Sequence, residues 1–264
     1  MTHSPLVTRA PDVIPGAMVS SVDIITEPTG AVLDRGALCG TLHPEEQALA
    51  ATLSDASRPA FVAGRTALRA ALEAAVPSAA SAPLLRGPRG GPVVHPSASG
   101  SISHKRTRAI AIAAPAFADA DVDRVRHVGI DLELRPTAAS LERMQGDPQG
   151  GTHRSLAERI LTAREQRALH GLDTFAHRDA TLLRFALKEA VYKAIDPWVQ
   201  RYVRFTEVEL DLSPAGDAGI AVVTLLLPER PPLIVTAAWW RDETWITATA
   251  MSEHTARQGV PTAD

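Results

Sequence analysis

The sequence predicts an α+β fold made of two similar halves, each a small antiparallel sheet packed with helices. Two observations support this prediction. The order strand, helix, helix, strands occurs twice along the 264 residues, and the later strands of each half follow one another directly. Grouped helices and adjacent strands are typical of antiparallel α+β folds, whereas a strict alternation would indicate a parallel sheet. We expect an N-terminal half over residues 1–120 and a C-terminal half over residues 121–264.

The N-terminal half is expected to contain an early strand, two helices and a later strand. The early strand is predicted over residues 18–25. A helix then begins at Leu42-His-Pro-Glu-Glu-Gln47 and runs to about residue 54, and a longer helix covers residues 58–76. Residues 77–83, rich in Ala, Ser and Pro, are expected to form an irregular loop. A strand over residues 101–114 completes this half.

The C-terminal half repeats this order. A strand is predicted over residues 128–134, and a Gly-rich loop over residues 145–152. Thr162 is a plausible helix N-cap because Glu165 follows three positions later, the spacing of a capping box. A longer helix covers residues 180–195. The remaining strands are predicted over residues 203–212, 220–227, 233–240 and 244–251.

The two helix starts provide the clearest sign of a repeat. Leu42-His-Pro-Glu-Glu-Gln47 resembles Leu161-Thr-Ala-Arg-Glu-Gln166, and aligning the longer helices places Arg65 opposite Lys188. The alternative is chance similarity between two amphipathic helices. If the repeat is real, a ligand is expected in the cleft between the halves, where such sites commonly lie.

Composition excludes several classes of protein. The net charge of −3 argues against a general nucleic-acid binder, so any anion site must be a local cluster. Cys39 is the only cysteine, so no intramolecular disulfide can form. The N-terminus lacks the basic and apolar regions of a secretion signal, and the apolar runs are too short to span a bilayer. We therefore expect a cytoplasmic protein with no nucleic-acid or membrane partner.

Charged residues on one strand and one helix suggest a metal site. Asp131 and Glu133 are two positions apart on a strand and so point to one face. If Glu189 joins them, three carboxylates would suit a hard cation such as Mg²⁺, with Lys188 and Lys193 beside it for a phosphorylated ligand. Each group also has an alternative without a functional role. Glu189 and Lys193 can form an ion pair on the exposed face of a helix, and Asp131 and Glu133 can lie on the exposed polar face of a strand.

Basic residues in three separate segments suggest an anion pocket. Arginine forms bidentate bonds to phosphate oxygens, although each arginine alone is more typical of an exposed surface. The candidate residues are Arg58, Arg65, Arg86, Arg89, Ser103 and His104. A Ser-His-Asp hydrolase is less favoured because the sequence has no Gly-x-Ser-x-Gly motif, and the Gly-Pro-Arg-Gly-Gly segment lacks the ending of a nucleotide P-loop.

In this order, these motifs resemble those of the Sfp-type 4'-phosphopantetheinyl transferases, most closely their enterobactin-synthesis-like branch. The matching motifs are Phe61-Val-Ala-Gly64-Arg65, Arg86-Gly-Pro-Arg-Gly-Gly-Pro92, Ser101-Ile-Ser-His104, Gly129-Ile-Asp131-Leu-Glu133 and Lys188-Glu189-Ala-Val-Tyr-Lys193-Ala. The resemblance implies the fold of that family, a pseudo-twofold monomer of two α+β halves with the active site between them.

The resemblance also implies a reaction. The family transfers the 4'-phosphopantetheine arm of coenzyme A to a serine of an acyl- or peptidyl-carrier protein, which activates fatty acid, polyketide and nonribosomal peptide synthases. Asp131, Glu133 and Glu189 would bind Mg²⁺, with Glu189 also the base for the serine hydroxyl and Lys193 reaching the pyrophosphate together with Lys188. The basic residues listed above would hold the adenosine 3'-phosphate end, which places this end on the N-terminal half.

The sequence departs from the family pattern in two places, and two other functions remain as alternatives. The segment over residues 137–152 is longer and richer in glycine than the family pattern, and the residues just before Lys188 also differ. An Mg²⁺-dependent phosphodiesterase or nuclease would also combine acidic residues with a lysine. A non-catalytic module that binds coenzyme A or a carrier protein is the third reading.

Overall fold

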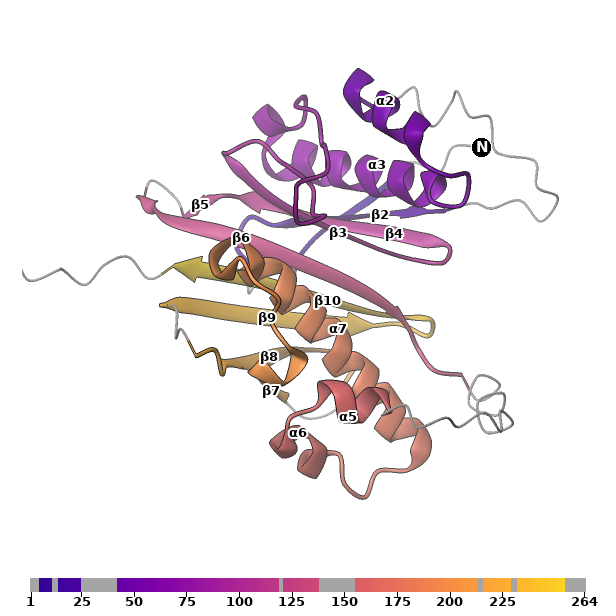
Figure 1. Ribbon diagram of the computed structural model, residues 1–264, viewed down its shortest axis with the longest axis vertical. Coiled ribbons are helices and arrows are strands. Elements are labelled where there is room, and N and C mark those ends of the chain that lie inside the picture. Colours follow the sequence, from indigo (N-terminus) through magenta and orange to yellow (C-terminus); the bar gives the residue numbers. More distant parts are fainter. Residues whose placement is uncertain are drawn as a thin grey trace, which may run out of the picture.

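The structure is a computed structural model of the 264-residue chain. It describes residues 5–10, 14–24, 42–118, 121–137, 155–212, 216–228 and 232–254. Cys39 and the predicted loop over residues 145–152 lie outside the described residues. The described part has antiparallel sheets and helices grouped around them, so the prediction of an α+β fold is confirmed (Figure 1).

The N-terminal half contains a four-stranded antiparallel sheet in the order β1-β2-β4-β3. Its strands are β1 (Leu6–Arg9), β2 (Met18–Asp23), β3 (Ala98–Lys105) and β4 (Arg108–Pro115). Its helices are α2 (Pro44–Thr52), α3 (Arg58–Ala75) and the 3₁₀ helix η1 (Pro77–Ala79). Helix α3 lies across one face of the sheet, where its apolar stripe is buried (Figure 1).

The C-terminal half contains a six-stranded antiparallel sheet in the order β5-β6-β10-β9-β8-β7. Its strands are β5 (Phe117–Ala118), β6 (Asp121–Leu134), β7 (Val208–Leu212), β8 (Ala218–Leu225), β9 (Leu233–Arg241) and β10 (Trp245–His254). Its helices are α5 (Leu156–Ile160), α6 (Ala163–Ala168), α7 (Thr174–Val199) and the 3₁₀ helix η2 (Phe205–Glu207). Helix α7 packs on this sheet as α3 packs on the first.

The two sheets meet through one apolar cluster. Val19 and Ile112 of the first sheet share one apolar cluster with Ile130 and Met251 of the second. Residues on the opposite sheet faces belong instead to the clusters with α3 and α7. In the view of Figure 1, helix α3 lies above the first sheet and helix α7 crosses in front of the second. Strand β5 already pairs with β6, while the division of the chain at residues 120 and 121 stays a prediction.

A row of serines joins the halves along β3 and β6. Ser99 Oγ accepts the backbone N–H of Val128 at 2.9 Å, and Ser101 Oγ accepts that of Ile130 at 3.2 Å. Alternate residues of a strand point to one side, so these hydroxyls provide a ladder of partners where the backbones of β3 and β6 do not pair. The ladder fixes β6, which carries the predicted carboxylates, against the N-terminal half.

Gly129 lets α7 lie directly on β6. A Cβ atom at this position would stand 1.9 Å from the carbonyl oxygen of Ala190, so a larger residue would force the helix away from the strand. The close approach brings the helix segment with Glu189 and Lys193 over the strand segment with Asp131. The geometry of the candidate site therefore depends on a glycine outside it.

An internal ion pair recurs in both halves with the same spacing. Glu46 pairs with Arg69 and Glu165 pairs with Lys188, with a separation of 23 residues in each case. Both glutamates also form the capping box of their own helix, α2 or α6, as predicted for Glu165. The residue opposite Lys188 is therefore Arg69, and the alignment of Arg65 with Lys188 was wrong by four positions.

Several predicted elements differ from the structure, including the strand predicted over residues 128–134, which begins at Asp121 as β6. The strand predicted over residues 101–114 is the hairpin of β3 and β4, which turns at Arg106 in a left-handed conformation with φ 46°. Helix α7 extends beyond both predicted ends, and the segment over residues 203–212 includes η2 before β7 begins. No helix in the described ranges is long and apolar enough to cross a membrane.

Candidate active site

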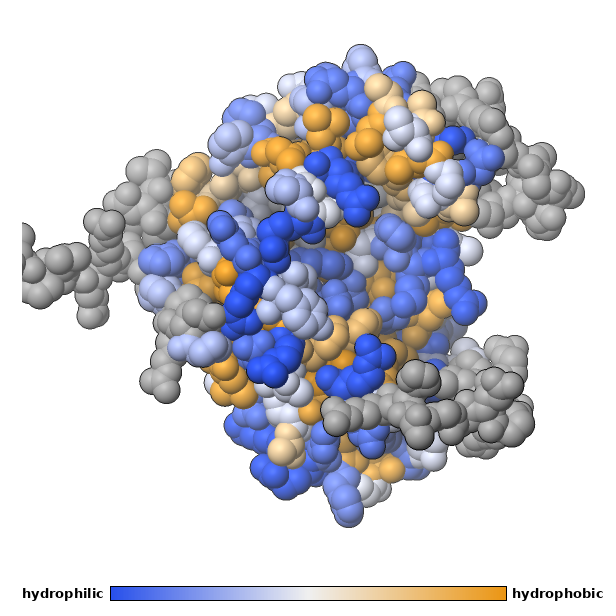
Figure 2. All heavy atoms as spheres, in the orientation of Figure 1, coloured by the Kyte–Doolittle hydropathy of each residue, from blue (hydrophilic) through white to orange (hydrophobic). Residues whose placement is uncertain are grey.

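A cleft of about 700 Å³ lies between the two halves. The N-terminal half contributes α3, the loop over residues 86–92 and β3, while the C-terminal half contributes α7. Hydrophilic residues gather at the waist between the halves on the face shown in Figure 2. The titratable residues that line the cleft are Arg65, Arg86, Arg89, His104, Glu189, Tyr192, Lys193 and Asp196.

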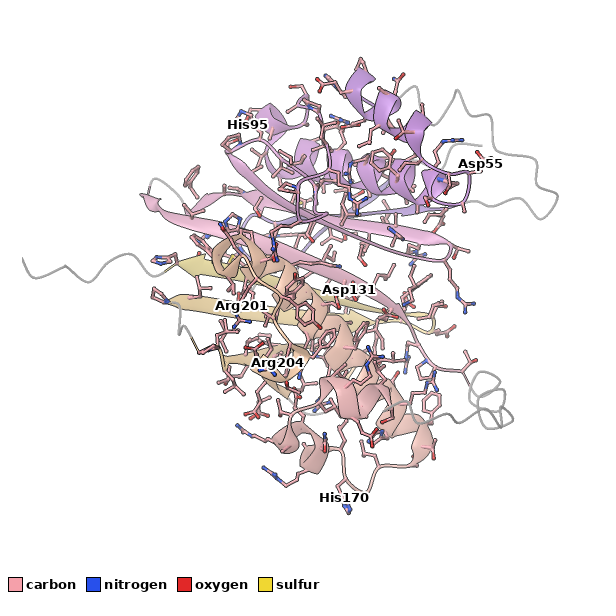
Figure 3. The ribbon with its side chains drawn as sticks, in the orientation of Figure 1. Asp55, His95, Asp131, His170, Arg201 and Arg204 are labelled. Carbon is pink, nitrogen blue, oxygen red and sulfur yellow. The ribbon has the colours of Figure 1, made fainter. Side chains whose placement is uncertain are left out.

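Asp131 lies near the middle of the molecule, beside α7 (Figure 3). Its Oδ1 atom accepts a hydrogen bond from Ser103 Oγ and another from Lys193 Nζ, each at 2.8 Å. Its Oδ2 atom is buried and has no hydrogen-bond partner in the described residues. A buried carboxylate oxygen without a donor is costly, so this atom is a fitting ligand for a bound cation.

Glu189 lies one turn before Lys193 on α7 and lines the cleft. Within the described ranges its carboxylate forms no hydrogen bond or ion pair, in contrast to those of Asp131 and Glu133. Burial raises the pKa of Glu189; the Lys193 ammonium opposes this rise, and the carboxylates of Asp131 and Glu133 add to it. Glu189 is therefore a cleft carboxylate free to accept a proton or bind a cation.

Glu133 has a different environment from Asp131. Lys105 Nζ lies 2.8 Å from its Oε1 atom and 2.7 Å from its Oε2 atom. Burial raises the pKa of Glu133, and the bond from Lys105 lowers it again. No three His, Cys, Asp or Glu side chains of the described segments stand close enough to hold a metal ion together. The carboxylates of Asp131, Glu133 and Glu189 are close enough to affect one another, but in this part of the chain they are not arranged to bind one metal ion together.

Arg65 and Arg86 form the basic wall of the cleft. Arg65 is buried, its Nε donates to the carbonyl of Leu84 at 2.5 Å, and its guanidinium lies 4.6 Å from the centre of the Phe61 ring. Burial lowers the pKa of Arg65; Glu46 opposes this, and the charge of Arg86 adds to it. Two guanidinium groups that repel each other in a cleft are stabilised by a bound anion.

His104 lines the same cleft from β3. The residue as a whole is exposed, but its imidazole ring is partly buried. This burial lowers the pKa of His104, Lys193 lowers it further, and Asp131 opposes the change. An anion beside the ring would favour its protonated form. His104 therefore suits a phosphate ligand, as the sequence predicts.

Arg89 also lines the cleft, but it is already paired. Its Nε atom donates to both oxygens of Asp196, at 2.9 and 2.8 Å, and its NH2 atom lies 2.5 Å from Asp196 Oδ1. The same guanidinium donates to the Tyr192 hydroxyl at 3.3 Å. The contact joins the loop of the first half to α7 of the second. Arg89 is therefore a clasp between the halves in this structure.

Four predicted ligand-binding residues are not among those that line the cleft: Arg58, Ser103, Asp131 and Lys188. Ser103 and Asp131 are bonded to each other. Arg58 donates to the carbonyls of Ala50 and Leu53, at 2.9 and 2.7 Å, and so closes the C-terminal end of α2. Lys188 donates to Glu165 Oε2 at 2.6 Å and its side chain is 0% exposed. These contacts do not support a ligand-binding role for Arg58 or Lys188, because a sequence pattern shows which helix carries a cation but not which partner satisfies it.

Three further residues take part in the site without having been predicted from the sequence: Lys105, Tyr192 and Asp196. Lys105 had a usable signal, since it follows Ser103 by two positions on the same strand face. Ser103 reaches Asp131 and Lys105 reaches Glu133, each across 28 residues. The two donors thus match the two acceptors in register. Asp196 carried no such signal, because its partner comes from a distant loop.

Comparisons with known proteins identify the family of the chain. A model of the 4'-phosphopantetheinyl transferase superfamily matches residues 127–250, and a model of the 4'-phosphopantetheinyl transferase N-terminal domain matches residues 45–114. Together they include α3, β3, β6 and the cleft-lining part of α7. The chain therefore belongs to the 4'-phosphopantetheinyl transferase superfamily, and it is an enzyme of that class. No curated protein sequence matches it.

Solved structures of related proteins cover about half of the chain. An apo acyl-carrier-protein synthase (ACPS) from Chronobacterium ammoniagenes is 19% identical, with a TM-score of 0.38, and the match covers 50% of this chain and 99% of that one. The complex of that synthase with coenzyme A is 19% identical, with a TM-score of 0.37, and the match covers 50% of this chain and 98% of that one. A holo-(acyl-carrier-protein) synthase from Bacillus anthracis, in complex with CoA (3',5'-ADP), is 22% identical, with a TM-score of 0.35. The match covers 48% of this chain and 96% of that one.

Proposed function

We propose that this enzyme transfers the 4'-phosphopantetheine arm of coenzyme A to a serine of an acyl- or peptidyl-carrier protein in an Mg²⁺-dependent reaction. The observation that carries the proposal is the composition of one cleft. Arg65, Arg86 and His104 line one side, and Glu189 and Lys193 line the other. A ligand with phosphates at two separated positions would satisfy both sides, and coenzyme A has this property.

The N-terminal half is proposed to hold the adenosine 3'-phosphate. Arg86 and His104 form no ion pair or hydrogen bond with a carboxylate in the described residues, so a phosphate would be a suitable counter-ion for them. The cleft volume of about 700 Å³ lies within the usual range of small-molecule sites, roughly 300–1,000 Å³. A ligand in the cleft would touch both halves of a single chain, which supports a monomeric enzyme.

The C-terminal half is proposed to hold the metal and the reacting pyrophosphate. Asp131, through its unpartnered Oδ2 atom, and Glu189 are suited to bind Mg²⁺. Once bound, the ion would offset charge that develops on the pyrophosphate as its anhydride bond breaks. Lys193, already bonded to Asp131, lies at the cleft wall to reach a phosphate oxygen. The sequence-based assignment of Glu133 as a third ligand stays a prediction.

Glu189 is proposed as the base. The serine oxygen of the carrier forms a bond to the phosphorus of the phosphopantetheine, and the bond from that phosphorus to the bridging oxygen breaks. Adenosine 3',5'-bisphosphate leaves with that oxygen, and the serine proton passes to Glu189. Burial raises the pKa of Glu189, and a raised pKa makes a carboxylate a better proton acceptor.

Intact-mass measurement of a panel of apo-carriers tests this function. With coenzyme A and Mg²⁺, one or more carriers should gain the mass of one phosphopantetheine. The gain should vanish without coenzyme A, after chelation of the metal, or when the carrier serine is replaced by alanine. Release of adenosine 3',5'-bisphosphate with no carrier modified would favour the phosphodiesterase reading, and binding with no turnover would favour a non-catalytic module.

A further inference from the structure

Lys105 lies at the end of β3, beside the acidic residues of β6. Its ammonium contacts both carboxylate oxygens of Glu133, at 2.8 and 2.7 Å. The Glu133 side chain is 9% exposed and the Lys105 side chain is 41% exposed. The lysine is thus the more exposed member of the pair, and its ammonium contacts both of the oxygens that Glu133 could offer to a cation.

The other two carboxylates differ in this respect. Asp131 is bonded through Oδ1 alone, and its Oδ2 atom has no partner among the described residues. Glu189 is free of hydrogen bonds and ion pairs in the same part of the chain and lines the cleft. Two carboxylates thus have oxygens available to a cation, whereas Glu133 has both of its oxygens in contact with Lys105.

We propose that Lys105 is a built-in counter-ion for Glu133, so that the metal is held by Asp131 and Glu189 and not by Glu133. The inference rests on the proposed function, since it concerns the metal of that reaction. Lys105 is a positioning residue: it acts through Glu133 and does not touch the ligand. Mg²⁺ in phosphate-binding sites is usually held by one or two carboxylates plus phosphates and water, which agrees with this arrangement.

The charges around the metal site indicate what the Lys105–Glu133 pair would do. In the described part of the site, the carboxyl groups of Asp131, Glu133 and Glu189 interact with the ammonium groups of Lys105 and Lys193. If Glu133 were free, the metal would face three carboxylates and bind more tightly without its substrate. Lys105 instead keeps the affinity of the empty site low, so that the substrate phosphates supply the remaining oxygen ligands.

Mg²⁺ titration of the enzyme with coenzyme A bound, followed by calorimetry, tests the inference. Asp131→Asn and Glu189→Gln should each weaken Mg²⁺ binding more than about tenfold, as the loss of a direct ligand would. Glu133→Gln should weaken it less than about threefold, because a side chain outside the coordination sphere acts only indirectly. An equal loss for Glu133→Gln and Asp131→Asn would overturn the inference.

Lys105→Met provides the sharper comparison. It should tighten Mg²⁺ binding about fivefold, the size expected when a partly exposed ion pair is removed and its carboxylate becomes available. The gain should disappear in the Lys105→Met, Glu133→Gln double variant. Arg108→Gln is the matched control, since Arg108 faces Lys105 across the same hairpin but pairs with Asp23; it should leave the affinity within about twofold.

Thermal unfolding gives a readout that does not depend on turnover. Lys105→Met leaves Glu133 buried without its partner, so the melting temperature should fall without Mg²⁺ and recover when Mg²⁺ is added. Lys105→Arg should behave as wild type. A Lys105→Met variant whose Mg²⁺ affinity is unchanged or weaker would overturn the inference. Absence of both Mg²⁺ binding and transfer in wild type would overturn it together with the proposed function, whereas transfer with a metal-binding Glu133 would overturn the inference alone.

Discussion

Ser103 donates its hydroxyl proton to Oδ1 of Asp131 at 2.8 Å, and this bond crosses from the N-terminal half to the C-terminal half. It continues the row begun by Ser99 and Ser101, whose hydroxyls accept backbone N–H groups of β6. Ser103 thus differs from the other two in bonding a side chain of the candidate site. The same seam that joins the halves also orients the carboxylate proposed to bind the metal.

The serine row predicts different effects for neighbouring substitutions. Ser103→Ala should lower kcat about tenfold or more, since partners that orient a metal ligand have effects of this size, with little loss of stability. Ser101→Ala should instead reduce the free energy of unfolding by about 1–3 kcal/mol, because it leaves the buried N–H of Ile130 without an acceptor. Steady-state kinetics and urea unfolding check the pair. Full activity in Ser103→Ala would show that the hydroxyl does not orient Asp131.

The raised pKa of Glu189 predicts a pH dependence. The base form is deprotonated, so transfer should rise with pH through the pKa of Glu189 and fall as pH drops below it. Because burial raises this pKa, the acidic limb of kcat/KM should lie above the usual range of a glutamate. A rate profile with that limb in the ordinary carboxylate range would assign it to another group.

Lys188 is predicted to stabilise the fold and not to bind coenzyme A. Its buried ammonium pairs with Glu165, and breaking such a pair on one side costs about 3–5 kcal/mol. Lys188→Met should therefore lower the free energy of unfolding by that amount, while the folded fraction keeps its coenzyme A affinity. Arg69→Met is the matched variant in the other half, since Arg69 pairs with Glu46. Weaker coenzyme A binding without lost stability would restore the ligand-binding role of Lys188.

The clasp between Arg89 and Asp196 predicts an order among the arginines. Arg86→Ala should weaken coenzyme A binding about ten- to a hundredfold, with a smaller effect on dephospho-coenzyme A, because it removes a charge-assisted bond to the 3'-phosphate. Arg89→Ala should have a smaller effect, since Asp196 already holds this guanidinium. Asp196→Asn should tighten coenzyme A binding by releasing Arg89. Calorimetry gives the affinity of each variant for coenzyme A and for dephospho-coenzyme A. If Arg89→Ala reduces the preference for coenzyme A more than Arg86→Ala does, the clasp between Arg89 and Asp196 opens on binding.

The sequence predicted the fold class and the elements around the site, because hydrophobic patterns and the capping box at Thr162 and Glu165 are local signals. It did not predict the hairpin between β3 and β4, since the turn at Arg106 and Thr107 lacks the glycine or asparagine that marks such turns. The strand therefore looked continuous. The hairpin matters for the site, because it ends β3 at Lys105.

The partners of buried cations were the least predictable feature. Helix α7 is apolar on most of its surface, so its sequence alone does not show that Glu189 and Lys193 face the cleft while Lys188 turns toward Glu165. The spacing of 23 residues shared by the two internal ion pairs would have separated these roles. Finding it requires an alignment of the halves by their ion pairs as well as by their apolar positions.

The most direct test of the account compares wild type with Glu189→Gln by intact mass of an apo-carrier, incubated with coenzyme A and Mg²⁺. Wild type should convert the carrier fully to the phosphopantetheine-bearing form. Glu189→Gln should bind coenzyme A and melt cooperatively like wild type, yet leave the carrier unmodified. Conversion by the variant at a rate close to that of wild type, or none by wild type with any carrier, would contradict the account.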